Sequence, residues 1–248
     1  MNEQLLLAIE TSSPRGSVAL GRGGRVLAWR ALAASRKHTA ELLPAIRDLL
    51  HEAGCEPREG GTSLWPVDVV CFSRGPGSFT GLRVAATVAR MWQSAAGSRV
   101  VAVPTLEVIA RNALLQPERP ARLAVIIDAR QGKLFGAVFE RDGDELRTVV
   151  DAALHEADSW LAGLEKPCWV LGEGVAQHAQ ALAAAGLTML PEDTWLPDAR
   201  QVLAIGQRLA DAGQYCTPAQ IVPAYLRPPE CEEVYEQRRA EARQRRGE

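Results

Sequence analysis

The residues best suited to chemistry are two acids, each at the end of an apolar run. Glu10 ends the run LLLAIE and is followed at once by Thr11 and Ser12. Asp128 ends a second run, LAVIID. A carboxylate followed by small hydroxyl side chains at the end of a buried strand can hold a divalent cation and a phosphate. We therefore treat these residues as candidates for a nucleotide or anion site.

A glycine-rich loop, SRGPGSFTGLR at residues 73–83, lies where a strand gives way to a helix. Gly75 and Gly77 predict the turn, and Ser78 predicts the N-cap of a helix over residues 79–96. Backbone N–H groups at such a helix start make a ready anion site. However, the loop lacks the third glycine of a dinucleotide fingerprint and the Lys-Ser/Thr pair of a P-loop. The residues alone therefore favour a plain strand–turn–helix connection.

Other catalytic arrangements are missing from the sequence. The four histidines show no metal-binding spacing, H-x-x-x-H included, and there is no G-x-S-x-G elbow. The five cysteines contain no C-x-x-C, a pattern that fits free thiols in a reducing compartment. We expect no metal site and no cofactor that this chain would turn over.

Composition narrows the class of protein. The chain has 248 residues, 47% hydrophobic and 23% charged, which is typical of a globular protein with one large domain or two lobes. A net charge of −2 gives no general attraction to nucleic acid or to an anionic membrane, so an RNA contact would need a local patch or a partner. Because neither a signal peptide nor a transmembrane stretch is apparent, we expect a cytoplasmic protein without membrane contacts.

The same strand pattern occurs twice, about half a chain apart. The first copy reads as strands LLLAIE, GSVALG and RVLAWR, with a tight turn at GRGG. The second reads as LAVIID, KLFGAVFE and LRTVV, with a tight turn at RDGD. The first copy is followed by helices near 38–54, 79–96 and 105–115 and by strands near 67–72 and 99–103. The second is followed by helices near 156–164, 175–185 and 198–212 and by a strand near 168–171.

This pattern predicts a duplicated actin-like (ribonuclease-H-like) α/β fold, with two lobes that each have a mixed sheet opened by a three-stranded β-meander. We assign residues 1–118 to the N-terminal lobe, 119–228 to the C-terminal lobe and 229–248 to a charged, flexible tail. A ligand would lie between the lobes, near Glu10 and Asp128.

The expected helix near 38–54 has an apolar stripe that includes Leu42 and Ile46, while Leu43 points away from it. The stripe is best explained by packing onto the protein's own sheet. Pro44 costs about 3 kcal/mol inside a helix. We therefore expect a kink there, or a helix that begins only at Leu43.

Motifs across nearly the whole chain resemble the bacterial TsaB (YeaZ) family. They are LAIETSSPRGSVAL, HTAELLPAIRDLL, SRGPGSFTGLRVAATVA, IDAR-x-G and PAYLR. The glycine-loop motif is the most specific of these. The resemblance implies a non-catalytic paralogue of TsaD that helps to place threonylcarbamoyl on the adenosine next to the anticodon of tRNAs reading codons that begin with A.

The resemblance also implies partners. TsaD would be a direct heterodimer partner, and the ATPase TsaE would join the pair. TsaC would supply threonylcarbamoyl-adenylate, and tRNA would be met through the complex. For the chain alone, a homodimer and a monomer both remain open. In this family the metal-binding histidines belong to TsaD, and their absence here agrees with a non-catalytic role.

The family resemblance and the residue patterns each give a set of candidate site residues. The helix after the glycine loop and the helix beginning near His38 would meet TsaD, so the expected interface residues are His38, Thr39, Leu43, Phe79, Leu82, Arg83 and Ala86. The candidate vestigial nucleotide or anion site comprises Glu10, Thr11, Ser12, Gly75, Gly77, Ser78 and Asp128.

Two other functions remain open from the residues. The chain could be an autonomous actin-like ATPase or kinase relative that binds Mg-ATP between its lobes. Against this, no glycine follows Glu10 directly, and the acid is longer than an aspartate. A peptidase is the third alternative, although no nucleophile–base pair or metal triad is recognisable.

Overall fold

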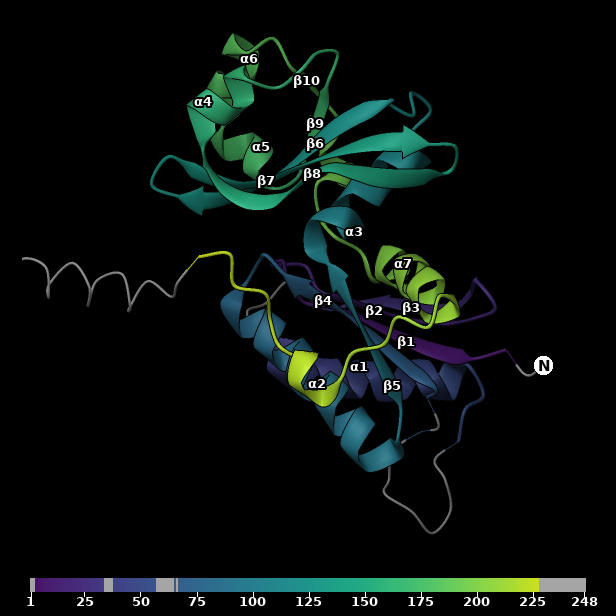
Figure 1. The fold of residues 1–248 in the computed structure, drawn as a ribbon. Coiled ribbons are helices and arrows are strands. Elements are labelled where there is room, and N and C mark those ends of the chain that lie inside the picture. Colours follow the sequence, from purple (N-terminus) through teal and green to yellow (C-terminus); the bar gives the residue numbers. More distant parts are fainter. Residues whose placement is uncertain (1–2, 34–37, 57–64, 66, 228–248) are drawn as a thin grey trace, which may run out of the picture.

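The computed structural model describes residues 3–33, 38–56, 65 and 67–227, except for the side chains of His38 and Thr39. The predicted tail, residues 229–248, lies outside this part of the chain. Two lobes stand one above the other in Figure 1, and each is built on a five-stranded sheet. The predicted duplicated α/β fold is confirmed.

The first sheet consists of the predicted β-meander and two further strands. Its strands, in the order β3-β2-β1-β4-β5, are β1 (Leu5–Glu10), β2 (Ser17–Arg22), β3 (Arg25–Ala31), β4 (Val69–Gly75) and β5 (Arg99–Pro104). The meander strands are antiparallel, whereas β4 and β5 extend the sheet in parallel. Every residue of β1 is buried, because helices cover both faces of the sheet.

Helices from distant parts of the chain cover the first sheet. α1 (His38–Glu52) and α2 (Phe79–Ala96) pack on the face that carries Leu7 and Ile9. The opposite face, with Leu6 and Ala8, packs against α7 (Ala199–Asp211). Alternate β1 residues thus enter different cores, as the period of two in a strand requires.

The second lobe repeats the plan. Its strands, in the order β10-β9-β6-β7-β8, are β6 (Arg122–Arg130), β7 (Lys133–Asp142), β8 (Glu145–Glu156), β9 (Trp169–Leu171) and β10 (Thr188–Met189). β6, β7 and β8 form the second antiparallel meander, and β9 and β10 are parallel to β6 and β9, respectively. The outer face is covered by α4 (Ala157–Ala162), α5 (Gly174–Gln177) and α6 (Ala179–Ala184). The inner face packs on α3 (Thr105–Arg111), which lies between the lobes in Figure 1.

The predicted C-terminal lobe, 119–228, needs a correction. Helix α7 packs on the first sheet through Val202, Leu203 and Ile205, and Ile221 is buried in the core under α1 and α2. The chain therefore returns to the first lobe after the second is complete (Figure 1). An amphipathic stripe predicts that a helix is half-buried, but it does not identify the surface that buries it.

Several helix boundaries also differ from the prediction. The expected helix over 175–185 is two short helices, α5 and α6, that meet at His178. The helix near 105–115 is α3 followed by a 3₁₀ turn, η1 (Asn112–Leu115). α1 begins at His38 and contains Pro44, so the alternative start at Leu43 is wrong. Its buried leucine and isoleucine stripe offsets the missing hydrogen bond at the proline. Among the described residues, no helix is both long and apolar enough to cross a membrane.

Candidate functional site

Glu10 lies at the end of β1 with no exposed surface. One carboxylate oxygen accepts hydrogen bonds from the backbone N–H and the hydroxyl of Ser12, both at 2.5 Å. The other accepts one from the Ser73 hydroxyl on β4. Burial raises the pKa of Glu10 to about 6, although these hydrogen bonds lower it in part. The carboxylate is therefore enclosed by its own loop and by the neighbouring strand.

The glycine loop packs directly against the backbone after Glu10. The Ser78 N–H donates to the Ser12 carbonyl at 2.6 Å, and the Thr11 hydroxyl donates to the Gly81 carbonyl at 2.8 Å. A Cβ atom at Gly77 would lie 2.4 Å from the Ser12 carbonyl oxygen, and one at Gly81 would lie 1.8 Å from that of Thr11. The glycines thus permit a close approach of two backbone segments.

This packing changes the interpretation of the predicted anion site. Ser78 is the N-cap of α2, as predicted, and its hydroxyl accepts a hydrogen bond from the Gly81 N–H at 3.3 Å. The Ser12 carbonyl occupies the Ser78 N–H that would otherwise point toward a bound anion. Gly75, with φ +120°, donates its N–H to the Thr105 hydroxyl at 3.1 Å. The N–H groups of Gly75, Ser78 and Gly81 therefore bind the protein's own backbone and side chains.

Asp128 lies in the other lobe and has partners there. Its carboxylate accepts a hydrogen bond from the Arg130 N–H at 3.2 Å and lies 3.3 Å from the His178 Nε2 atom. Burial and the negative charge of Asp128 raise the pKa of Glu173. The contact with His178 was not predicted, because a lone histidine in the sequence carries no sign of its spatial neighbour.

The second lobe uses glycine in the same way as the first. A Cβ atom at Gly172, where φ is +114°, would lie 2.2 Å from the Ile126 carbonyl oxygen. One at Gly174 would lie 3.0 Å from the Asp128 nitrogen. Within the described residues, no hydrogen bond or ion pair joins Asp128 to Glu10. The duplication therefore places an acid in each lobe without joining the two acids into one site.

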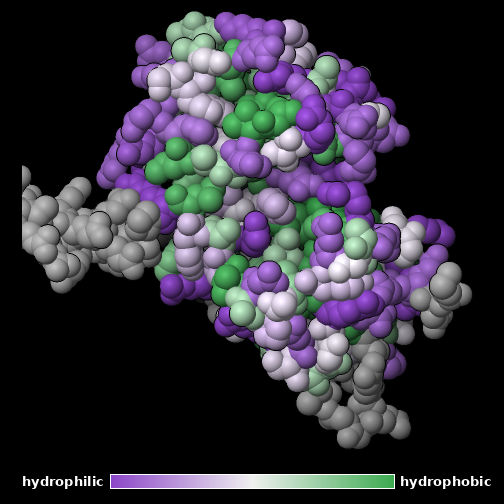
Figure 2. Space-filling view, in the orientation of Figure 1, coloured by the Kyte–Doolittle hydropathy of each residue, from purple (hydrophilic) through white to green (hydrophobic). Residues whose placement is uncertain are grey.

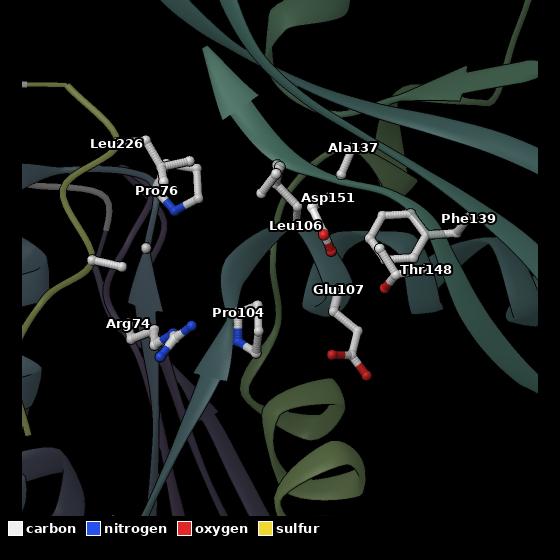
Figure 3. Close-up of a pocket in the computed structure, with 13 residues that line it drawn as sticks. Arg74, Pro76, Pro104, Leu106, Glu107, Ala137, Phe139, Thr148, Asp151 and Leu226 are labelled. Carbon is white, nitrogen blue, oxygen red and sulfur yellow. The ribbon is translucent and has the colours of Figure 1, made fainter. Parts of the chain in front are cut away.

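A cavity of about 290 Å³ lies between the lobes, but neither Glu10 nor Asp128 lines it. Figure 3 shows Arg74 on one side and Glu107 with Asp151 on the other. Burial raises the pKa of Glu107, which accepts a hydrogen bond from Arg208 at 2.8 Å. Of the predicted nucleotide-site residues, only Gly75 lines this cavity. On the face shown in Figure 2, hydrophobic side chains are exposed on both sides of the hollow between the lobes.

The outer surface of α1 and α2 carries a larger, apolar groove of about 590 Å³. It is lined by Leu42, Leu43, Phe79, Thr80, Arg83, Val84, Thr87, Val88 and Met91. Leu43 is 45% exposed and Phe79 is 41% exposed, so both contribute apolar surface to the groove. Arg83 lies beside them, with its guanidinium carbon 3.9 Å from the centre of the Phe79 ring.

Two predicted interface residues do not belong to this surface. Leu82 is 1% exposed and Ala86 is 4% exposed, so both pack inside the lobe. They follow the inner face of α2, where residues three and four apart lie above one another. Nothing is described of the side chains of His38 and Thr39. Leu43, Phe79 and Arg83 remain as the exposed members of the predicted set.

The two meanders, each extended by parallel strands and covered by helices, define a duplicated actin-like, ribonuclease-H-like fold. Residues 32–232 match the family model TsaD: tRNA N6-adenosine threonylcarbamoyltransferase. The chain is 31% identical over 230 residues to the tRNA threonylcarbamoyladenosine biosynthesis protein TsaB of Escherichia coli K12, covering 90% of this chain and 94% of that one. Together with the relatives below, these matches show that the chain belongs to the TsaB family.

Two further relatives agree. The TsaB protein of Bacillus subtilis 168 is 28% identical over 181 residues, which cover 71% of this chain and 74% of that protein. The solved structure of YeaZ from Pseudomonas aeruginosa superposes with a TM-score of 0.74 at 28% identity, covering 90% of this chain and all of that one. The resemblance expected from the motifs is therefore confirmed.

Proposed function

We propose that this protein acts in tRNA threonylcarbamoyladenosine biosynthesis as a non-catalytic partner of TsaD. The observation that carries the proposal is the contrast between the two candidate sites. The acid and glycine loop are closed by the protein's own backbone, whereas the α1–α2 groove is open and apolar. Membership of the TsaB family supplies the pathway.

The closed site supports the non-catalytic part of the proposal. The Glu10 carboxylate already accepts hydrogen bonds from Ser12 and Ser73, and it has no exposed surface on which to bind a metal ion. A phosphate bound at the Ser78 N–H would have to displace the Ser12 carbonyl. We therefore expect neither ATP hydrolysis nor tRNA modification by this chain alone.

The open groove supports a protein partner. Large apolar side chains with an arginine among them are characteristic of the central residues of protein interfaces. Leu43 and Phe79 supply exposed apolar surface on α1 and α2, and Arg83 supplies the charge. We propose that this groove is the surface that pairs with TsaD.

The wider set of partners is also a proposal. TsaE would join the TsaD pair, TsaC would supply the threonylcarbamoyl-adenylate, and tRNA would bind through the complex. Without TsaD, the same apolar groove could join two copies of this chain. A cytoplasmic location agrees with the four cysteines of the described residues, which are all free thiols.

Co-purification with TsaD from the same organism tests the proposal. We expect a complex on a sizing column, and tRNA modification that requires both chains. Leu43→Glu should abolish both, because it places a carboxylate where the partner would bury an apolar side chain, while the free chain keeps its melting temperature. ATP turnover by this chain alone that is lost in Glu10→Ala would instead support the ATPase alternative. Normal pairing by Leu43→Glu would exclude the groove.

A further inference from the structure

The segment Pro223–Arg227, at the end of the described residues, contacts both lobes. The Ala224 N–H donates to the Arg74 carbonyl at the end of β4, at 2.7 Å. Gly75 makes this approach possible, because a Cβ atom there would lie 2.7 Å from the Ala224 carbonyl oxygen. In Figure 1 this segment, drawn in yellow, runs past α2 and continues toward the second lobe. We call residues 223–227 the strap.

The far end of the strap is attached to the second lobe. The Arg227 guanidinium donates to the Ala129 carbonyl at 2.6 Å and to the Gln131 side-chain oxygen at 2.8 Å. Ala129 is in β6, and Gln131 is in the turn that leads to β7. The strap is therefore held at the first lobe by Ala224 and at the second by Arg227.

Tyr225 lies between these two attachments and contacts the α1–α2 groove. Its hydroxyl accepts a hydrogen bond from the Arg83 Nε–H at 2.9 Å. Its ring lies 5.3 Å from the Phe79 ring, centre to centre. Arg83 also stacks on Phe79, so the guanidinium is restrained by two aromatic side chains. Within the described part of the chain, no hydrogen bond or ion pair engages the two outer Arg83 nitrogens.

We propose that Tyr225 is a positioning residue for partner binding, which it serves by holding the Arg83 guanidinium ready for a carboxylate of the partner. This inference rests on the proposed function. A guanidinium binds a carboxylate best through two parallel N–H groups. Tyr225 accepts only the Nε–H of Arg83, which leaves the two terminal nitrogens for the partner. The restraint lowers the conformational entropy that Arg83 would otherwise lose on binding.

The groove indicates the chemistry of the occupant. Arg83 is the only charged side chain among the residues that line it. The complementary surface on the partner would be apolar and would carry a single aspartate or glutamate opposite Arg83. Because the strap is attached at Arg227, the position of Tyr225 depends on the second lobe as well as on the first.

A double-mutant cycle on TsaD binding tests the positioning role. Tyr225→Phe keeps the ring and removes the hydroxyl, and Arg83→Lys keeps the charge and removes the planar group. We expect each to weaken binding about tenfold, and the double variant to bind no more weakly than either one. Tyr215→Phe is the matched control, since its hydroxyl bonds to Ala210 far from the groove, and it should bind within about twofold of wild type. Additive losses of about a hundredfold would overturn the proposal.

A second measurement needs no partner. The Nε–H resonance of Arg83 in the free chain should be protected from exchange with water in the wild type and unprotected in Tyr225→Phe. Equal exchange in the two would overturn the positioning role, even if the wild-type chain failed to bind TsaD and the proposed function itself were wrong.

The contribution of the second lobe has its own test. Arg227→Ala should weaken TsaD binding about threefold, although Arg227 does not line the groove. Arg147→Ala removes an exposed arginine that pairs with Glu140 and serves as the control. Equal binding by these two variants would overturn the dependence on the second lobe.

Discussion

At Glu10, a side chain in the position of a ligand-binding acid has become part of the protein core. Its oxygens accept hydrogen bonds from Ser12 and Ser73, and its neighbours Thr11 and Ser12 contact the start of α2. The residue types were apparent from the sequence as a candidate anion site. Whether the site is open depends on the backbone distance at Gly77 and Gly81, which no residue type specifies.

The raised pKa of Glu10 gives a pH dependence of stability. In the folded protein the Glu10 carboxyl group has a pKa of about 6, whereas its ordinary pKa is 4.5. The stabilising contribution is therefore fully present below pH 4.5 and is lost as the pH rises through about 6. Relative to Glu10→Gln, the wild type should lose about 2 kcal/mol of unfolding free energy between pH 4.5 and pH 8.

Urea denaturation of both proteins across this pH range measures the difference. Glu118→Gln, at an exposed position, is the control and should follow the wild type. A Glu10→Gln variant with the same pH dependence as the wild type would show that the carboxylate is not held in the buried environment described here.

At the scale of elements, helix α2 has two functions on two faces. Its inner face, with Leu82 and Ala86, completes the core of the first lobe, and its outer face carries Phe79 and Arg83. Amphipathic periodicity predicted the helix and its bounds of 79–96, and the N-cap at Ser78 agrees. Leu82 was expected at the partner surface, but its side chain is buried within the lobe.

Adjacent residues of α2 should therefore respond oppositely to the same substitution. Leu82→Glu should destabilise the fold by several kcal/mol, because it buries an unpaired carboxylate. Arg83→Glu should change stability by no more than about 0.5 kcal/mol and should abolish TsaD binding. Thermal melts and a sizing column with TsaD distinguish these effects. Similar melting temperatures for the two variants would contradict the described packing of Leu82.

At the scale of the whole molecule, the two lobes are not independent units. The inner face of the first sheet is covered by α7, which follows the second lobe in sequence, and Ile221 enters the core under α1 and α2. The strap then contacts both lobes through Ala224 and Arg227. The order of elements in the chain therefore differs from their grouping in space (Figure 1).

A chain of residues 1–118 should accordingly fail to fold. It lacks Val202, Leu203 and Ile205, each of which contributes about 1.5–3 kcal/mol of burial, while a whole domain is stable by only about 5–15 kcal/mol. We expect strong binding of a hydrophobic dye and no cooperative melt, in contrast to the full chain. A cooperative transition of residues 1–118 near the full-length melting temperature would show that α7 is dispensable.

The sequence by itself determined the repeated meander, the helix after the glycine loop and the family. These depend on local periodicity, turn residues and motifs, all of which are written along the chain. Only the tertiary structure decided that the Glu10 loop is closed, that Leu82 is buried and that Tyr225 contacts Arg83. Those facts depend on contacts between residues up to 142 positions apart, and the geometry of such contacts is fixed by packing rather than by local preference.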